Sequence, residues 1–148
     1  MKLTILGTGN AGVAECYNTC FVLSNEQGNF LVDGGGGNGL FHQLKRAGLK
    51  WQDLRTILGI VWMIRFICQG MARGQYEGEA TIYGHDEVIK CLRLLAEQLF
   101  TPQETKYIDT RLHLVEVKDA QEVNILGCKT VFFDILSTKA KQFGFTMD

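Results

Sequence analysis

A chain of 148 residues is long enough to bury the core of one domain, and its formal net charge of −1 excludes a strongly basic or acidic protein. Lysines and arginines are spread along the chain, so no basic stripe indicates nucleic-acid binding and no acidic tail indicates disorder. The longest apolar run, residues 58–68, contains Arg65 and is too short to span a bilayer, so we expect no membrane segment.

The cysteines form an odd set without the spacing of a disulfide framework, which is typical of reduced thiols in a cytoplasmic protein. Cys16 and Cys20 are spaced like a metal-binding pair, but no second Cys or His pair lies close by. We therefore interpret them as small, half-buried thiols near a strand. The five residues are Cys16, Cys20, Cys68, Cys91 and Cys128.

The first third of the chain predicts three strands and a helix. Residues 2–6, 19–23 and 29–32 are expected to be neighbours in one mixed or antiparallel sheet, with a hairpin turn at residues 25–28. Asp33 and four consecutive glycines follow, which indicates an unusual backbone conformation or a close approach. Asn38 is the expected cap of a helix over residues 39–47, packed on one face of this sheet.

The remainder predicts helices first and strands afterwards, without internal repeats. This order indicates an α/β or α+β layered domain, which we expect to occupy residues 1–148 as a single unit. The expected elements are a helix over residues 58–72 that is apolar nearly all round, a strand over 80–83, a helix over 87–100 capped by Asp86, and strands over 112–117, 122–125, 129–135 and 143–147.

One glycine-rich segment allows two interpretations. Gly7, Gly9 and Gly12 follow a strand in the pattern G-x-G-x-x-G, and Asp33 lies about twenty residues further on, as in a dinucleotide-binding unit. That function requires a helix over residues 11–23, although this segment has the composition of a strand. The alternative is a plain glycine turn at the rim of a site.

The junction between Ile57 and Leu58 has no loop. If a strand ends at Ile57 and a helix begins at Leu58, the usual connection of roughly 2–6 residues and its polar cap are both absent. Either residues 51–70 form one long helix, or residues of the molecule between Ile57 and Leu58 are missing from this sequence. The other possibility is a true deletion, in which the protein itself lacks these residues.

The strand–turn–hairpin opening over residues 2–37 and the segment 130–148 resemble the metallo-β-lactamase-fold hydrolases, on the branch near ribonuclease Z. The resemblance implies an αββα sandwich, of which this chain holds the first half and ends within the domain. It implies a cytoplasmic, zinc-dependent hydrolase with two Zn²⁺ and a phosphodiester or RNA substrate. It also places Thr8, Asn18, Asp33 and Gly34 at the rim of the active site.

Two departures from this family concern the metal ligands. The expected His-x-His-x-Asp-His motif is absent, because Arg55-Thr56-Ile57 runs straight into Leu58. A metal-binding histidine of the family falls at Leu136, and a leucine cannot bind a cation. We therefore expect the chain as written to hold no metal and to be catalytically inactive. The alternatives are a dinucleotide-binding module or a metal-free interaction protein.

The three histidines do not restore a metal site, since none is near another in sequence. We interpret His42, His85 and His113 as ordinary polar or half-buried residues, and Lys141 as part of a solvated loop. The half-sandwich would expose an apolar sheet face, and an exposed apolar face favours self-association. We therefore expect a homo-oligomer that does not bind membranes.

Overall fold

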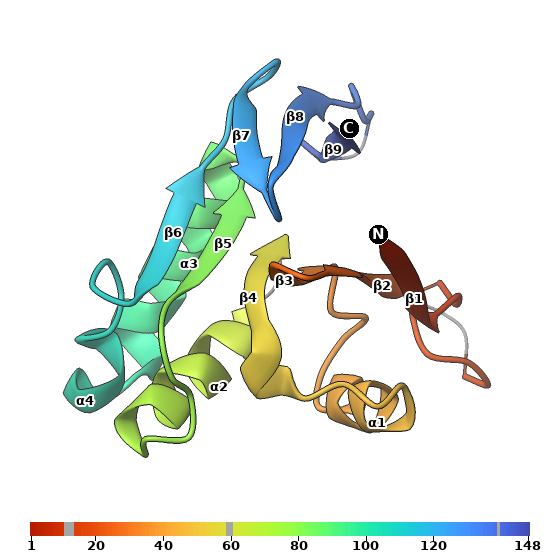
Figure 1. Cartoon of the computed structure of the whole chain (residues 1–148). Helices are drawn as coiled ribbons and strands as arrows, with labels where there is room; N and C mark the ends of the chain where they lie inside the picture. Colours follow the sequence, from red (N-terminus) through yellow and green to blue (C-terminus); the bar gives the residue numbers. More distant parts are fainter. Residues whose placement is uncertain (11–13, 59–60, 139) are drawn as a thin grey trace.

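The computed structural model describes residues 1–10, 14–58, 61–138 and 140–148 (Figure 1). It contains two sheets. The first has six strands in the order of the chain: β1 (Lys2–Gly7), β2 (Cys20–Asn25), β3 (Gly28–Val32), β4 (Leu54–Leu58), β5 (Ala80–Gly84) and β6 (Leu112–Glu116). The second has three strands, β7 (Glu122–Ile125), β8 (Cys128–Asp134) and β9 (Phe143–Met147).

The first sheet changes from antiparallel to parallel at β3. β1, β2 and β3 pair in antiparallel fashion, and the β2–β3 hairpin closes with Asn25 opposite Gly28, as the turn residues predicted. From β3 to β6 each strand pairs in parallel with the next, because a helical crossover separates them. The predicted neighbourhood of the first three strands is confirmed.

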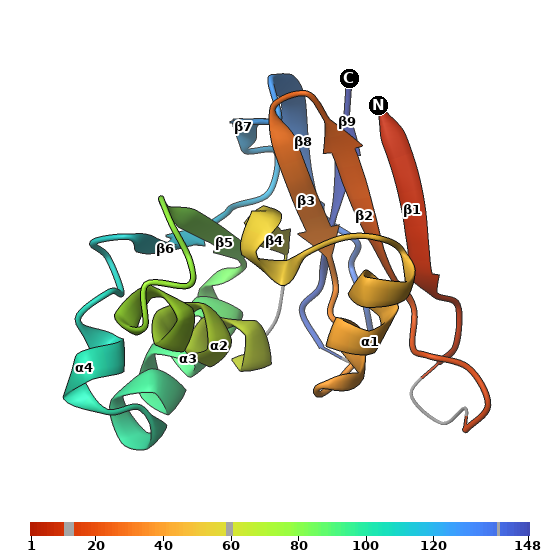
Figure 2. The same cartoon turned by 60° about the horizontal axis from the view of Figure 1, so that its bottom comes forward.

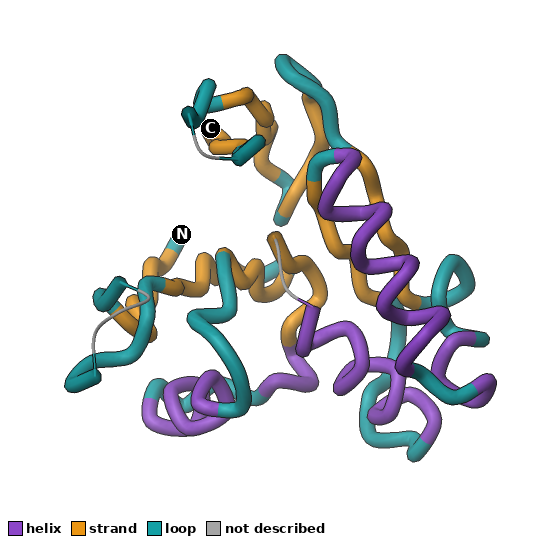
Figure 3. The backbone as a smooth tube through the Cα atoms, turned by 180° about the vertical axis from the view of Figure 1, so that it is seen from behind, coloured by secondary structure: helices purple, strands orange, loops and turns teal. Residues whose placement is uncertain are grey.

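The helices cover one face of the first sheet and the second sheet covers the other (Figures 1 and 2). Side chains such as Leu31, Ile57 and Ile82 are buried beneath the helices, whereas Phe30 and Phe132 are buried between the two sheets. Figure 3 shows the helices from behind. They are α1 (Gly39–Arg46), a 3₁₀ turn at Trp51–Asp53, α2 (Val61–Ala72), α3 (Asp86–Leu99) and α4 (Pro102–Thr105).

Three local expectations need correction. A single helix over residues 51–70 is wrong, because Leu54–Leu58 pairs as a strand between β3 and β5. For the same reason Leu58 ends β4 instead of starting a helix, while residues 59–60 lie outside the described residues. Asp86 is the first residue of α3, and His85 occupies the cap position. Asn38 does cap α1 by position, but its side chain makes no capping hydrogen bond.

All five cysteines are free thiols, and two of them lie fully inside the core beneath the helices. Burial raises the pKa of Cys20 to about 11 and that of Cys68 to about 12, because the thiolate would lose its hydration. Cys16 and Cys91 are exposed, so the expected half-burial of Cys16 is wrong. Among the described residues, no helix is long and apolar enough to cross a membrane.

Candidate functional site

The site is built at the carboxyl ends of the parallel strands β3, β4 and β5. In sheets of this kind, ligands bind where such strands end. Asp33 follows β3, Leu58 ends β4 and His85 follows β5, and the Asp33 amide donates to the Leu58 carbonyl at 3.1 Å. A hollow of about 460 Å³ opens there; it is lined by Val32, Asp33, Leu58, Tyr83, Gly84, His85, Val88, Ile135, Lys141, Gln142 and Phe143.

Asp33 is held by the glycine turn that follows it. It adopts a left-handed backbone conformation with φ of 57°, and its Oδ1 accepts hydrogen bonds from the amides of Gly34 and Gly35. The Tyr17 hydroxyl donates to the carbonyls of Gly34 at 2.7 Å and Gly36 at 2.9 Å. Burial raises the pKa of Tyr17 to about 12, and Cys20 and Asp33 nearby act in the same direction. Asp33 therefore holds the amides of the glycine turn, and Tyr17 holds its carbonyls.

A second, smaller hollow shares Asp33 with the first. Its volume is about 300 Å³, and it is lined by Gly9, Asn10, Asn18, Thr19, Asp33 and Gly35. The Thr19 hydroxyl donates to the Gly9 carbonyl at 2.8 Å, and the Gly9 amide donates to the Tyr17 carbonyl at 2.9 Å. Asn18 and Asp33, two of the expected rim residues, therefore lie in one depression.

The other two expected rim residues lie beside this depression. Gly34 is buried next to Asp33, and Thr8 is exposed at the end of β1. Neither residue lines either hollow. A role for Thr8, Asn18, Asp33 or Gly34 in an active site stays a prediction.

The dinucleotide interpretation is wrong in its structural requirement. It needed a helix over residues 11–23, but Asn18 forms a β-bridge with Gly9 and β2 begins at Cys20. Within residues 14–19, the described part between the glycine turn and β2, no helix N-terminus is present to receive a pyrophosphate. The Asp33 carboxylate, assigned to a ribose in that interpretation, instead bonds the amides of its own turn. Gly12 lies outside the described residues.

The structure adds an ion pair that sequence reasoning missed. Lys141 Nζ donates to Asp86 Oδ1 at 2.6 Å, which joins the segment before β9 to the start of α3. This hydrogen bond lowers the pKa of Asp86 and raises that of Lys141. His85 is buried next to the pair, with Nδ1 at 3.7 Å from Asp86 Oδ1 and no hydrogen-bond partner in the part of the chain that the structure describes.

Leu136, the position expected to have lost a metal-binding histidine, lies in the loop after β8. Its side chain is 82% exposed, and its backbone is left-handed with φ of 53°. Its amide donates to Asp134 Oδ1 at 2.8 Å. The preceding residue, Ile135, lines the larger hollow, so Leu136 stands at its margin.

These side chains do not suit zinc. A catalytic zinc ion needs about three protein ligands, and no three His, Cys, Asp or Glu side chains come together within residues 1–10, 14–58, 61–138 and 140–148. His85 is the one histidine at the strand ends. His42 is exposed on α1, and His113 lies 3.1 Å from Glu79. The residues present therefore do not form the metal centre that the resemblance implies.

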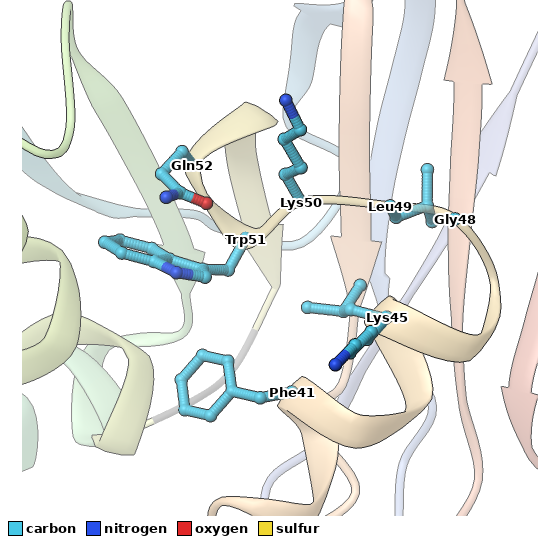
Figure 4. Close-up of a pocket in the computed structure, with 8 residues that line it drawn as sticks. Phe41, Lys45, Gly48, Leu49, Lys50, Trp51 and Gln52 are labelled. Atoms are coloured by element: carbon cyan, nitrogen blue, oxygen red, sulfur yellow. The ribbon is translucent and has the colours of Figure 1, made fainter.

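A further hollow of about 380 Å³ lies between α1 and the segment that leads into β4. In Figure 4 the Phe41 ring and the Trp51 indole face the same space. The Trp51 ring stacks on Tyr76 with centroids 6.0 Å apart, so it anchors this segment to the core. The full lining is Phe41, Leu44, Lys45, Gly48, Leu49, Lys50, Trp51 and Gln52.

No protein-family model and no curated protein matches the sequence. Solved structures do match the fold. The metallo-β-lactamase fold protein YhfI from Bacillus subtilis superposes with a TM-score of 0.71 at 14% identity, over 99% of this chain and 58% of that one. The short form of human tRNase Z (ELAC1) gives 0.67 at 19% identity, over 100% and 65%. A diphosphatase from the PhnP family gives 0.65 at 15% identity, over 98% and 61%.

The chain therefore has the metallo-β-lactamase fold, as its resemblance to that family predicted. Its mixed sheet, with helices on one face and a second sheet on the other, superposes on these structures over nearly its whole length. The chain spans only 58–65% of the length of the three structures. At identities of 14–19% the similarity establishes the fold alone.

Proposed function

We propose that this protein is a metal-free interaction protein built on the scaffold of a metallo-β-lactamase-fold hydrolase, and that the chain does not hydrolyse phosphodiesters. One observation carries the proposal: the polar groups at the strand ends are committed to each other. Asp33 bonds the amides of its own turn, and Asp86 is neutralised by Lys141. Leu136 occupies the margin where the resemblance places a metal-binding histidine.

Metal-dependent hydrolysis needs polar side chains that are free to bind cations. Metal-dependent hydrolysis uses bound cations to activate a water molecule and to stabilise the charge that develops on the phosphoryl oxygens. His85 supplies one imidazole at the strand ends, and one imidazole cannot hold such an ion.

Metal analysis of the purified chain tests the proposal. After saturation with zinc and desalting, we expect no stoichiometric zinc and no hydrolysis of bis(p-nitrophenyl) phosphate above background. Leu136→His alone should leave both results unchanged, because a single added imidazole gives fewer than the roughly three ligands that a catalytic site requires. Tight zinc in the unmodified chain would mean that a thiol or histidine assigned a structural role is a ligand.

A repaired variant provides the positive control. Inserting a His-x-His-x-Asp-His loop between Ile57 and Leu58, together with Leu136→His, brings at least three ligands to the strand ends. We expect this variant to retain zinc, whereas the same loop with alanine in place of each histidine should not. Failure of the repaired variant to bind zinc while folding normally would show that the strand ends are not placed as a metal site.

A zinc-dependent phosphoester hydrolase is the second candidate function. The similarity to human tRNase Z and to a diphosphatase favours it, and its substrate would be a phosphodiester or RNA, with two Zn²⁺ as cofactors. It requires ligands that the described residues do not bring together. Zinc retention with turnover by the unmodified chain would favour this candidate over the metal-free one.

A further inference from the structure

The hollow between α1 and the segment leading into β4 has two aromatic walls that the core holds in place. The Trp51 indole stacks on Tyr76, and a Cβ added at Gly70 of α2 would lie 2.5 Å from its Cη2, so the indole packs directly on the backbone of that helix. The Phe41 ring packs on Phe66 of α2 with centroids 4.4 Å apart. Both Phe41 and Trp51 are only half-buried and face the hollow (Figure 4). The walls are therefore formed before anything binds, which lowers the entropic cost of binding.

The rim of this hollow is positively charged. Among the described residues that line it, Lys45 and Lys50 are charged and none is acidic. Neither ammonium forms an ion pair with any described carboxylate. The stretch of residues 34–52 holds these two lysines and Arg46 but no Asp or Glu, in a chain whose net charge is −1. Free cations beside two uncovered rings are complementary to an occupant that carries an apolar group between negative charges.

The size of the hollow favours a single large side chain as its occupant. Its volume of about 380 Å³ lies near the lower end of the roughly 300–1,000 Å³ that small-molecule pockets have. Lys45 comes from α1 and Lys50 from the segment on the other side of the space (Figure 4), so an occupant that meets both needs carboxylates on two sides of its buried group. A peptide supplies this arrangement, because the residues before and after an anchor each extend the chain by about 3.3 Å.

Membranes and nucleic acids suit this surface less well. Binding to a membrane needs an apolar face that enters the lipid, whereas Phe41 and Trp51 form the walls of a depression. Binding to a nucleic-acid backbone needs a row of cations that follows successive phosphates, whereas two lysines line this hollow. An acidic protein segment is therefore the partner that the charge and the shape favour.

We infer that this hollow is the docking site for an acidic segment of a partner protein. An aromatic side chain of the partner is the anchor between Phe41 and Trp51, and carboxylates on either side of it pair with Lys45 and Lys50. An aromatic anchor in a preformed pocket supplies most of the binding energy of such a contact, and the charges at the rim select acidic segments over others. The inference rests on the proposed function as an interaction protein, because it names the surface and the kind of partner.

Changes in a peptide probe test the partner chemistry without altering the protein. The probe is the capped peptide Glu-Glu-Gly-Trp-Gly-Glu-Glu, titrated into the full chain by isothermal titration calorimetry. We expect a dissociation constant below about 1 mM. Alanine in place of the tryptophan of the peptide should raise this constant about tenfold or more. Lysine in place of its four glutamates should do the same, because the like charges then repel.

Variants of the protein locate the site. Lys45→Glu with Lys50→Glu should weaken binding of the acidic peptide about tenfold and let the lysine peptide bind in its place. Lys90→Glu with Lys118→Glu is the matched control, because these lysines are exposed elsewhere and the change in net charge is the same. This control should bind the acidic peptide like wild type, and circular dichroism should show unchanged folding in both double variants.

The outcomes separate this inference from the proposed function. A chain that binds no acidic peptide at about 1 mM but also retains no zinc would overturn the docking site and leave the metal-free function standing. Zinc retention with turnover by a chain that binds the peptide would overturn the metal-free function and leave the docking site. Binding that survives Lys45→Glu with Lys50→Glu, or that the control pair weakens equally, would overturn the site. So would binding of adenosine 5′-monophosphate or phosphatidylserine vesicles in place of the peptide.

Discussion

At the residue scale, the ring of Tyr17 leaves no room for a side chain at position 35. A Cβ at this position would lie 2.4 Å from the Tyr17 ring, and φ is +63°. Gly37 has the same φ of +63°, but its Cβ would meet nothing within 4 Å. Comparing substitutions at Gly35 and Gly37 therefore separates the cost of the left-handed backbone, which both positions share, from the clash with the Tyr17 ring, which only Gly35 has.

We expect Gly35→Ala to lower the free energy of unfolding by about 2–4 kcal/mol and Gly37→Ala by about 1 kcal/mol. Chemical denaturation of both variants measures the difference. In a Tyr17→Ala background the two costs should approach each other, because the ring is gone and only the Asn18 carbonyl oxygen, 3.1 Å from the added Cβ, still crowds position 35. Equal costs with Tyr17 present would show that the ring does not restrict this turn.

At the scale of one element, Glu104 links α4 to α2. Its carboxylate accepts hydrogen bonds from the Thr101 amide and from Gln69 Nε2, both at 2.7 Å, and it lies 3.5 Å from Arg65 Nε. Burial acts to raise its pKa, but these donors outweigh burial and the net pKa is lowered. A carboxyl pKa that is lower in the folded than in the unfolded protein stabilises the fold at every pH above the ordinary pKa of 4.5. This stabilisation is lost as the pH falls through the folded-state pKa.

Glu104→Gln should therefore cost about 1–3 kcal/mol at neutral pH, as for a buried group that loses charged hydrogen bonds. The difference from wild type should shrink as pH falls from about 4.5, where the unfolded chain takes up the proton, through the lowered folded-state pKa, where Glu104 of the native protein does so too. Glu97→Gln, at an exposed position of α3, serves as the control and should be near neutral. A cost that does not change with pH would assign the effect to packing instead of charge.

Local patterns predicted most of the elements, and tertiary context decided the others. Apolar alternation and turn residues located the β2–β3 hairpin, because both signals are contained in a few neighbouring residues. The pattern missed α4, although Thr101, Pro102 and Glu104 form a recognisable capping box. It also assigned Leu58 to a helix, since only the pairing of β4 between two parallel strands shows that this apolar run begins in a sheet.

The site was less predictable than the fold for a related reason. The family resemblance, which falls on contiguous segments near them, selects Asp33 and Asn18 as expected rim residues, and both line the smaller hollow. The contact between Asp86 and Lys141 joins residues 55 positions apart, and neither residue has a distinctive local motif. Contacts of this kind depend on how the second sheet folds back over the first, which spacing in the sequence does not encode.

At the scale of the whole molecule, the second sheet is held to the first by its inner face. Phe132 is fully buried between the sheets, whereas the next residue, Phe133, points the other way and is 39% exposed. Phe132→Ala should cost about 3–5 kcal/mol, as for a buried aromatic side chain, and Phe133→Ala about 1 kcal/mol. Thermal unfolding of the two variants gives the comparison. Similar losses for both would mean that the outer face of this sheet is also covered in solution.

The rate at which the fully buried thiols of Cys20 and Cys68 react measures how often the layers of this fold separate. An alkylating reagent reacts with thiolates, and both groups are protonated and shielded while the helices stay packed on the sheet. Cys16 and Cys91 should be modified at once, whereas Cys20 and Cys68 should react only as fast as the layers separate. Mass spectrometry of partly labelled protein would therefore report whether the α1–β2 side, near Cys20, and the α2 side, near Cys68, open together or one before the other.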